Sequence, residues 1–93
     1  MTDHVHEVAT AGITFSDALT HLKTGARIAR EGWNGKGMWL NLVQSKDYTA
    51  LNIHNGLLPW IGMKTVDDCF VPWIASQTDL LSEDWFTLSD ENA

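Results

Sequence analysis

Three glycines fall within six residues in the stretch Glu31-Gly-Trp-Asn-Gly-Lys-Gly-Met38. Glycine is used where φ must be positive or where another group approaches the backbone closely. Asn34-Gly35 is also a strong signal for a tight turn. The segment Ala26–Arg30 before the stretch alternates as a short strand, and Met38–Val43 after it is a second strand with Trp39, Asn41 and Val43 on one face. The stretch therefore predicts the tip of a β-hairpin.

The same turn carries groups that suit a nucleotide. Trp33 is a large flat aromatic residue, Lys36 is a cation, and Arg27 and Arg30 come just before the turn. An aromatic ring beside cations and open backbone N–H groups can hold a ring joined to phosphates. Taken alone, the motif favours a simple hairpin turn whose Trp33 folds back onto the core, and a nucleotide site is the alternative.

Length and charge limit the class of protein. The 93 residues correspond to one domain, small enough that a partner subunit would help to bury its apolar surface. The net charge of −6 argues against duplex DNA or an anionic membrane as the main partner, although four of the six basic residues gather between Lys23 and Lys36. The single cysteine, Cys69, fits a cytoplasmic protein. Neither a signal peptide nor an apolar run of membrane-spanning length is visible.

Two helices are expected. Thr14-Phe-Ser-Asp17 provides a cap and a first-turn acid for a helix of about ten residues, which Gly25 is placed to end. Apolar residues then recur at the spacing of one amphipathic helix face, at Phe15, Ala18, Leu19 and Leu22. Ser76-Gln-Thr-Asp79 is a capping box with Asp in the usual Glu position, and it opens a short second helix.

The other segments predict an antiparallel sheet. Besides the hairpin, strands are expected at Leu58–Lys64, Cys69–Trp73 and Trp85–Leu88. Pro72 indicates that its strand ends there or lies at an edge. Ser45–Gly56 predicts a loop, with a short strand near Thr49–Ile53 as an alternative. The fold class is therefore α+β, with an N-terminal amphipathic helix and a short C-terminal helix packed on an antiparallel β-sheet.

Two long motifs in fixed order connect the chain to a known family. The first combines Thr14-Phe15, Gly25 and Arg27-Ile-Ala-Arg-Glu-Gly-Trp-Asn-Gly-Lys-Gly-Met38; the second combines Met63-Lys-Thr65 and Val71-Pro-Trp-Ile-Ala-Ser-Gln-Thr-Asp-Leu-Leu-Ser-Glu-Asp-Trp85. From about Ile13 to Trp85 the chain closely resembles the small phage and prophage proteins of the Thoeris anti-defence 2 family. It departs from that pattern in its first twelve residues, in Ser45–Pro59, and in the turn Asp67-Asp68-Cys69, where the family usually has Asp-Gly.

The resemblance also implies a division of the chain. Residues 1–12 are an N-terminal extension, either a loose tail or an added edge strand. Residues 13–88 form a single α+β ligand-binding domain, and residues 89–93 are a polar tail.

The resemblance implies a sponge that acts in the cytoplasm of the infected bacterial host. Family members are homo-oligomers, usually tetramers, that bind and sequester a cyclic ADP-ribose-type signal of Thoeris immunity (glycocyclic ADP-ribose) without cleaving it. The effector that depletes NAD then stays inactive. Some members also take up cyclic dinucleotides. No cofactor, metal or catalytic residue is implied, and no DNA or membrane partner.

The ligand contacts follow from the resemblance together with the chemistry of the residues. Trp33 and Trp73 match the motif tryptophans of the family and are predicted to stack on the base. Asn34 and Gly35 would hydrogen-bond ribose or base edges. The phosphates would be neutralised by Lys36 or Arg30.

The second helix start supplies further candidates. Ser76, Gln77 and Thr78 can offer backbone N–H groups to an anion, and Asp79 would contact ribose hydroxyls. For Ser76 and Asp79, plain helix capping is the alternative. The other three tryptophans, Trp39, Trp60 and Trp85, are assigned to core or subunit packing.

Two other functions are weighed. A hydrolase of cyclic nucleotides could use His54 as base, Asp67 and Asp68 as metal ligands, or Cys69 as nucleophile, but no motif ties these residues together. A phage structural or assembly module could use the tryptophans as interface anchors. Such a module has no need of cations and glycines clustered beside Trp33.

Overall fold

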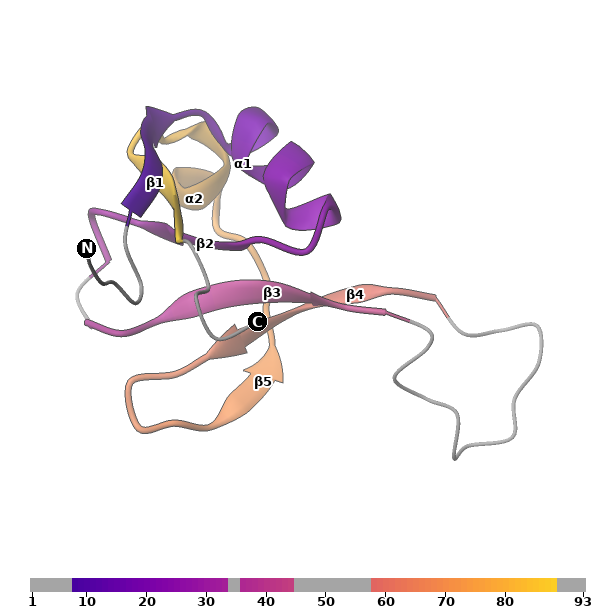
Figure 1. Cartoon of the computed structure of the whole chain (residues 1–93). Helices are drawn as coiled ribbons and strands as arrows, with labels where there is room; N and C mark the ends of the chain where they lie inside the picture. The colour runs from indigo at the N-terminus through magenta and orange to yellow at the C-terminus, as the bar shows by residue number, and fades with distance from the viewer. Residues whose placement is uncertain (1–7, 34–35, 45–57, 89–93) are drawn as a thin grey trace, which may run out of the picture.

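The computed structural model describes residues 8–33, 36–44 and 58–88 and has an α+β fold. Its elements are β1 (Val8–Ile13), α1 (Phe15–Lys23), β2 (Arg27–Arg30), β3 (Trp39–Val43), β4 (Trp60–Lys64), β5 (Phe70–Pro72), α2 (Gln77–Leu81) and β6 (Trp85–Leu88). The described strands form one antiparallel sheet in the order β1-β6-β2-β3-β4-β5. Both helices lie near the β1, β6 and β2 side of the sheet, where α1 also contacts β3, whereas β4 and β5 extend away from them (Figure 1). The expected α+β class with an antiparallel sheet is confirmed.

Helix α1 begins after a side-chain cap and ends before a glycine. The Thr14 side-chain oxygen accepts a hydrogen bond from the Asp17 backbone N–H at 3.2 Å, which satisfies one of the open donors of the first turn. Ala18 and Leu22 are fully buried on the side that faces the sheet. Gly25 has φ +104°, a left-handed conformation that favours glycine and lets the chain turn from α1 into β2.

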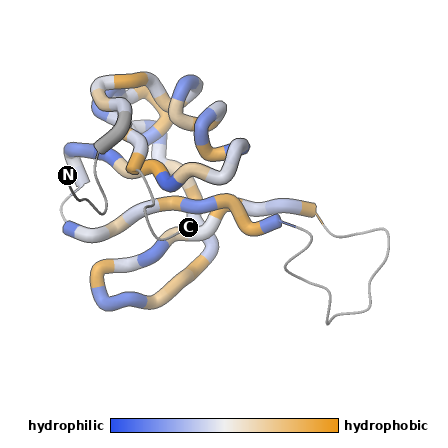
Figure 2. Tube along the Cα trace, in the orientation of Figure 1, coloured by the Kyte–Doolittle hydropathy of each residue, from blue (hydrophilic) through white to orange (hydrophobic). Residues whose placement is uncertain are grey.

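The core lies between α1 and one face of the sheet. Ile28 of β2 is paired with Leu40 of β3 on one side and with Thr87 of β6 on the other, so these side chains form a row on the same face. All three are buried, together with Trp85, and the middle of β2 beneath α1 is hydrophobic (Figure 2). The indole N–H of Trp85 donates to the Asp79 backbone carbonyl at 2.9 Å, so its polar group is satisfied within the core.

Several expected strands have the positions that the sequence predicts. β2 and β3 are antiparallel neighbours, which confirms the hairpin, although Asn34 and Gly35 lie outside the described residues. β6 spans Trp85–Leu88 as expected. β5 lies at one edge of the sheet, as Pro72 indicated, because a residue without an N–H is tolerated where no further strand needs it.

Other boundaries differ from the prediction. β4 begins at Trp60 and not at Leu58, since Pro59 lacks the N–H that a strand residue donates. The strand expected over Cys69–Trp73 is shorter and covers Phe70–Pro72. For the N-terminal segment, the edge-strand alternative holds over Val8–Ile13, which pairs with β6. The segment Ser45–Gly56 and the tail 89–93 lie outside the described residues.

The sheet face directed away from α1, called the outer face below, is rich in aromatic side chains. Trp39 alternates with the buried Leu40 and is therefore on this face. Phe70 lies between two tryptophans, with its ring centroid 6.3 Å from that of Trp39 and 6.1 Å from that of Trp60. The Phe70 ring covers Gly62 so closely that a Cβ at Gly62 would collide with it. Glycine at this position therefore lets the aromatic cluster form.

Candidate functional site

Two adjoining hollows border the segment between β2 and β3. The larger has a volume of about 350 Å³ and is lined by Gly37, Met38, Trp39, Lys64, Phe86 and Leu88. The smaller, of about 100 Å³, is lined by Ala29, Arg30, Glu31, Trp33, Lys36, Gly37, Met38 and Phe86. Because three lining residues are shared, the two hollows form one continuous surface along the turn.

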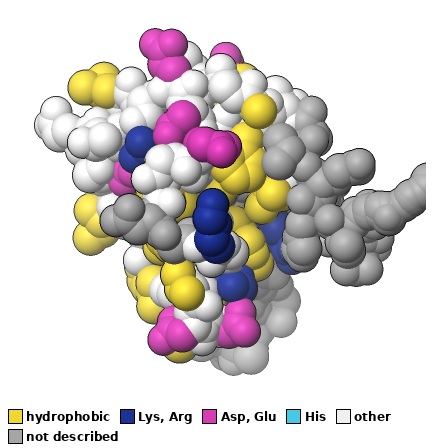
Figure 3. Space-filling view, turned by 90° about the vertical axis from the view of Figure 1, so that its left-hand side faces the viewer, with side chains coloured by type: hydrophobic (Ala, Val, Ile, Leu, Met, Phe, Trp, Pro, Cys, Tyr) yellow, Lys and Arg dark blue, Asp and Glu magenta, His cyan; other side chains and the backbone are white. Residues whose placement is uncertain are grey.

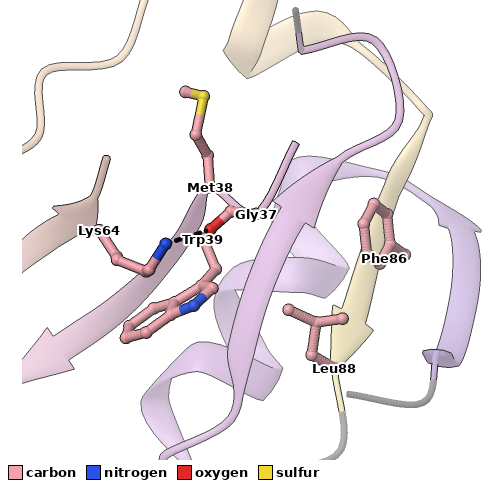
Figure 4. A pocket seen from close by; sticks show the side chains of 6 residues that line it. All are labelled: Gly37, Met38, Trp39, Lys64, Phe86 and Leu88. Atoms are coloured by element: carbon pink, nitrogen blue, oxygen red, sulfur yellow. Dashed lines mark hydrogen bonds between the residues drawn. The ribbon is translucent and has the colours of Figure 1, made fainter. Parts of the chain in front are cut away.

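The larger hollow lies between residues of β3 and β4 on one side and residues of β6 on the other, with one aromatic ring on each side. Trp39 and Lys64 face each other across β3 and β4, and Phe86 and Leu88 come from the same face of β6 (Figure 4). β2 runs between these two sides and places Ala29, the partner of Phe86, on this face. Ala29 is buried and lines the smaller hollow. A volume of this size falls in the range of about 300–1,000 Å³ that is usual for small-molecule sites.

Lys64 brings a positive charge to the edge of this apolar hollow. Its Nζ donates to the Gly37 carbonyl at 3.0 Å and to the Thr65 carbonyl at 3.1 Å, and it forms an ion pair with Asp68 Oδ1 at 2.9 Å. The Lys64 side chain is 24% exposed, whereas that of Asp68 is 82% exposed. The two backbone carbonyls thus fix the position of the ammonium group, and the solvent-exposed carboxylate of Asp68 partly neutralises its charge.

Trp39 is held on both sides by its neighbours. The guanidinium carbon of Arg27 lies 4.2 Å from the centre of the Trp39 ring, within the range of a cation–π contact. Phe70 approaches the same indole on the outer face. The sequence assigned Trp39 to packing, and the structure places it both in a packed aromatic cluster and in the lining of the larger hollow.

The end of the molecule that carries the β2–β3 turn is basic at its centre. Lys or Arg side chains lie in the middle of this face beside hydrophobic side chains, with acidic side chains above and below them (Figure 3). Lys36 and Lys64 line the smaller and the larger hollow respectively. Although the whole chain carries a net charge of −6, this face therefore offers a local site for an anion.

Arg30 has two carboxylate partners. Its Nη1 lies 2.9 Å from Asp79 Oδ1, and its Nε and Nη2 donate to the two oxygens of Asp84 at 2.9 and 3.3 Å. Asp84 also accepts a hydrogen bond from the Gly32 backbone N–H at 2.8 Å. The hydrogen bonds from Arg30 are the main reason that the pKa of Asp84 lies below its ordinary value. The charge of Arg30 is thus balanced within the protein, so of the two cations predicted for phosphate it is Lys36 that is exposed.

Trp33 and Trp73 lie against the same core residue. Their rings meet Trp85 edge-to-face, with centroid distances of 5.5 and 6.1 Å. The indole N–H of Trp33 donates to Asp79 Oδ1 at 3.1 Å, and Trp73 also contacts Phe15. Both rings therefore have a packing role. Trp33 in addition lines the smaller hollow, whereas Trp73 is not among the lining residues of either hollow.

The capping box at the start of α2 is complete. Ser76 Oγ accepts from the Asp79 N–H at 3.0 Å, and Asp79 Oδ2 accepts from the Ser76 N–H at 3.0 Å. Asp79 is buried, which by itself would raise its pKa, but hydrogen bonds from Ser76, Trp33 and Arg30 together outweigh burial and lower the pKa. Helix capping by Ser76 and Asp79 is therefore present. A ligand role for these two residues and for the exposed Gln77 and Thr78 stays a prediction.

A family model described as the Thoeris anti-defense 2-like domain matches residues 13–88, which include every lining residue of both hollows. The chain belongs to the Thoeris anti-defense 2-like family. A curated relative, named Thoeris anti-defense 2 and found in Bacillus phage SP01, is 38% identical over 86 residues, which cover 83% of this chain and 96% of the relative. The resemblance drawn from the two motifs is confirmed. Within this Thoeris anti-defense 2-like protein, the match begins at the last residue of β1, so the edge strand lies almost entirely before it.

Three of the residues weighed for hydrolysis, Asp67, Asp68 and Cys69, lie in a hydrogen-bonded turn between β4 and β5 of this Thoeris anti-defense 2-like protein. Asp67 Oδ1 accepts from the Thr65 hydroxyl at 2.6 Å, which lowers the pKa of Asp67, and Asp68 pairs with Lys64. The Thr65 hydroxyl oxygen also accepts from the backbone N–H of the exposed Cys69 at 3.0 Å. Within the described part of the chain, no three His, Cys, Asp or Glu side chains are placed to hold a metal ion. His54 lies outside the described residues.

None of the six residues that line the larger hollow was among the predicted ligand contacts: Gly37, Met38, Trp39, Lys64, Phe86 and Leu88. Gly37 and Met38 belong to the glycine-rich stretch, but no ligand role was predicted for them. One signal for Lys64 was available, because Met63-Lys-Thr65 is part of the motif shared with the Thoeris anti-defense 2 family. Phe86 and Leu88 alternate with the buried Trp85 and Thr87, which places them on the other face of β6. None of the helices among residues 8–33, 36–44 and 58–88 has the length and apolar character to cross a membrane.

Proposed function

We propose that this protein is a phage anti-Thoeris protein that binds and sequesters, without cleaving, a cyclic ADP-ribose-type immune signal, glycocyclic ADP-ribose. The observation that carries the proposal is the family match, which extends over residues 13–88, together with a relative whose name is Thoeris anti-defense 2. Acting in the cytoplasm of the infected host, the protein keeps the signal from the Thoeris effector. Cyclic dinucleotides, which have similar rings and phosphates, are a second ligand class within the proposal.

The chemistry of the two hollows supports a nucleotide ligand. A cyclic ADP-ribose contains a purine, two riboses and a pyrophosphate. The aromatic rings at the hollows can contact the purine, and stacking of one base on a Trp is worth roughly 1–3 kcal/mol. Lys36 and Lys64 stand at neighbouring hollows that share Gly37, so two cations are within one continuous surface for the pyrophosphate.

The proposed contacts centre on the turn. Trp33, Asn34, Gly35 and Lys36 contact the base, the ribose and the phosphates in this proposal. Arg30 is proposed to position these contacts. Its ion pairs with Asp79 and Asp84 connect the start of the turn to the segment around α2. Trp73 and the residues Ser76 to Asp79 are proposed as further contacts.

A homotetramer is part of the proposal. Its structural support is the outer face, where Phe70 is 47% exposed beside Trp39 and Trp60. A small domain that exposes large aromatic residues gains stability when a second copy covers them. Light scattering of the purified protein at micromolar concentration is expected to give the mass of four chains, and the mass of a single chain would contradict this part.

The test separates holding a signal from cutting it. The purified protein is incubated with glycocyclic ADP-ribose, separated from free ligand and heated, and the released molecules are identified by mass spectrometry. The expected result is intact cyclic signal in about stoichiometric amount, and restored effector activity after the release. A linear product formed at catalytic rates would support the hydrolase instead. If no nucleotide is bound, the remaining hypothesis is a phage structural or assembly module.

A further inference from the structure

Lys64 is the charged member among the six residues that line the larger hollow. The other five are glycine, two aromatic residues, a leucine and a methionine. In apolar surroundings a single charge acts more strongly on an approaching ion than the same charge in water. A ligand that enters this hollow therefore meets an apolar lining with the Lys64 ammonium at its edge, while the Arg27 guanidinium lies over the Trp39 ring.

The three partners of the Lys64 ammonium are not equivalent. Two are backbone carbonyls, at Gly37 and Thr65, and they fix the position of Nζ. The third is the carboxylate of Asp68, which is 82% exposed. An exposed ion pair is weak because water and salt compete with it. Asp68 is thus the one partner of Lys64 that another anion can replace without moving the backbone.

We propose that Lys64 is a ligand contact in the larger hollow and that Asp68 is its exchangeable counter-ion. The ligand class is a planar heteroaromatic ring joined to a phosphate. Its phosphate takes the place of Asp68 on Nζ, and its ring lies in the apolar space between Trp39 and Phe86. Arg27 and Phe70 fix the Trp39 indole, so this ring is ordered before the ligand arrives. This inference rests on the proposed function, because it assigns the same signalling nucleotide to particular residues of the surface.

The proposed exchange predicts whether altering Asp68 strengthens or weakens ligand binding. A residue that merely supports the turn weakens ligand binding when it is altered. Removal of a competing counter-ion strengthens ligand binding, because the phosphate then has no carboxylate to displace from Nζ. Asp68 has φ +67°, and asparagine tolerates this conformation well, so Asp68→Asn removes the charge without straining the turn.

The experiment measures the affinity of glycocyclic ADP-ribose by calorimetry at low and at high salt. Asp68→Asn is expected to bind up to about fivefold more tightly than the parent at low salt, the equivalent of the roughly 1 kcal/mol that an exposed ion pair can be worth. The gain should shrink at high salt. Lys64→Gln is expected to bind at least about tenfold more weakly, which corresponds to about 1.4 kcal/mol. The control is Glu83→Gln, which makes the same change in net charge at an exposed position outside both hollows and should leave affinity unchanged.

The outcomes separate this inference from the proposed function. Tighter binding by Asp68→Asn, with weaker binding by Lys64→Gln, supports the exchange. If the parent binds and Asp68→Asn binds equally or more weakly, the counter-ion role is overturned while the sponge function stands. Should Lys64→Gln fold poorly, Asp68→Asn alone decides the matter. A parent protein that binds no signal overturns the proposed function and this inference with it.

Discussion

Replacing Asp79 by asparagine tests the carboxylate that joins β2, the following turn and the start of α2. Oδ1 accepts from Arg30 and from the Trp33 indole, and Oδ2 accepts from the Ser76 backbone N–H. All three donors approach a side chain that is 11% exposed. An amide has one acceptor oxygen where the carboxylate has two, so Asp79→Asn cannot satisfy all three donors.

The loss of stability can be estimated from the orientation of that amide that keeps the most hydrogen bonds. Its oxygen stays with Arg30 and Trp33, and its NH₂ group then faces the Ser76 N–H. The lost capping bond costs about 1 kcal/mol. The bond to Arg30 loses its charge-assisted part, which costs about 1 kcal/mol more. A decrease of about 2–3 kcal/mol in the free energy of unfolding is expected, or roughly 10–20 °C in Tm for a chain of this size.

Thermal and urea unfolding at pH 7, followed by tryptophan fluorescence at one fixed protein concentration, would measure this decrease. Glu83→Gln is the matched control and should lie within about 0.5 kcal/mol of the parent. A change for Asp79→Asn no larger than that of the control would show that the three hydrogen bonds contribute nothing net, and would refute the reasoning.

The same carboxylate gives a pH dependence. The pKa values of Asp79 and Asp84 are both lower in the folded protein than the ordinary value of 3.8. A carboxyl with a depressed folded pKa contributes its full stability above the unfolded pKa and loses it as pH falls through the folded pKa. The free energy of unfolding should therefore drop as pH falls below about 4. Asp79→Asn should flatten this drop, and an unchanged slope would contradict the assignment.

Three further predictions concern binding and packing. Lys36→Glu should weaken binding of glycocyclic ADP-ribose, and the parent should bind less tightly as salt rises; an affinity that is flat in salt would argue against the basic cluster. Trp33→Ala and Trp73→Ala should each cost about tenfold or more in affinity if their rings stack on the ligand. Since both rings pack on Trp85, circular dichroism must show that the variants fold, and an unfolded variant would make that tryptophan structural. Gly62→Ala should destabilise the protein by about 1–3 kcal/mol because its Cβ meets Phe70, and much less in a Phe70→Ala background, as a thermal double-mutant cycle would show.

The sequence was sufficient where structure depends on residues close together in the chain. The capping box was visible because Ser76 and Asp79 are three positions apart and bond each other directly. Pro72 marked an edge strand because its missing N–H is a local property. The start of β4 was placed two residues early, since the missing N–H of Pro59 was expected to matter least near the start of a strand.

The site depends on contacts that no local pattern reveals. The larger hollow exists because β6 lies beside β2, which brings Phe86 and Leu88 opposite Trp39 and Lys64. Sequence alone does not give the order of strands in a sheet. Arg30 was assigned to phosphate for the same reason, because its two carboxylate partners follow 49 and 54 residues later in the chain.

The position of β6 in the sheet also determines when this protein can complete its fold. β6 comes last along the chain among the described elements, yet it lies between β1 and β2, and among the described strands it is the one that β1 pairs with. During synthesis, β1 and the outer edge of β2 must therefore wait until Trp85–Leu88 has left the ribosome. Joining β1 to β6 closes a loop over all of the other described elements, and such distant contacts slow folding. We expect the nascent protein to expose the unpaired edges of β1 and β2 until β6 inserts between them. Aggregation through these edges should therefore become less favourable once β6 has been translated.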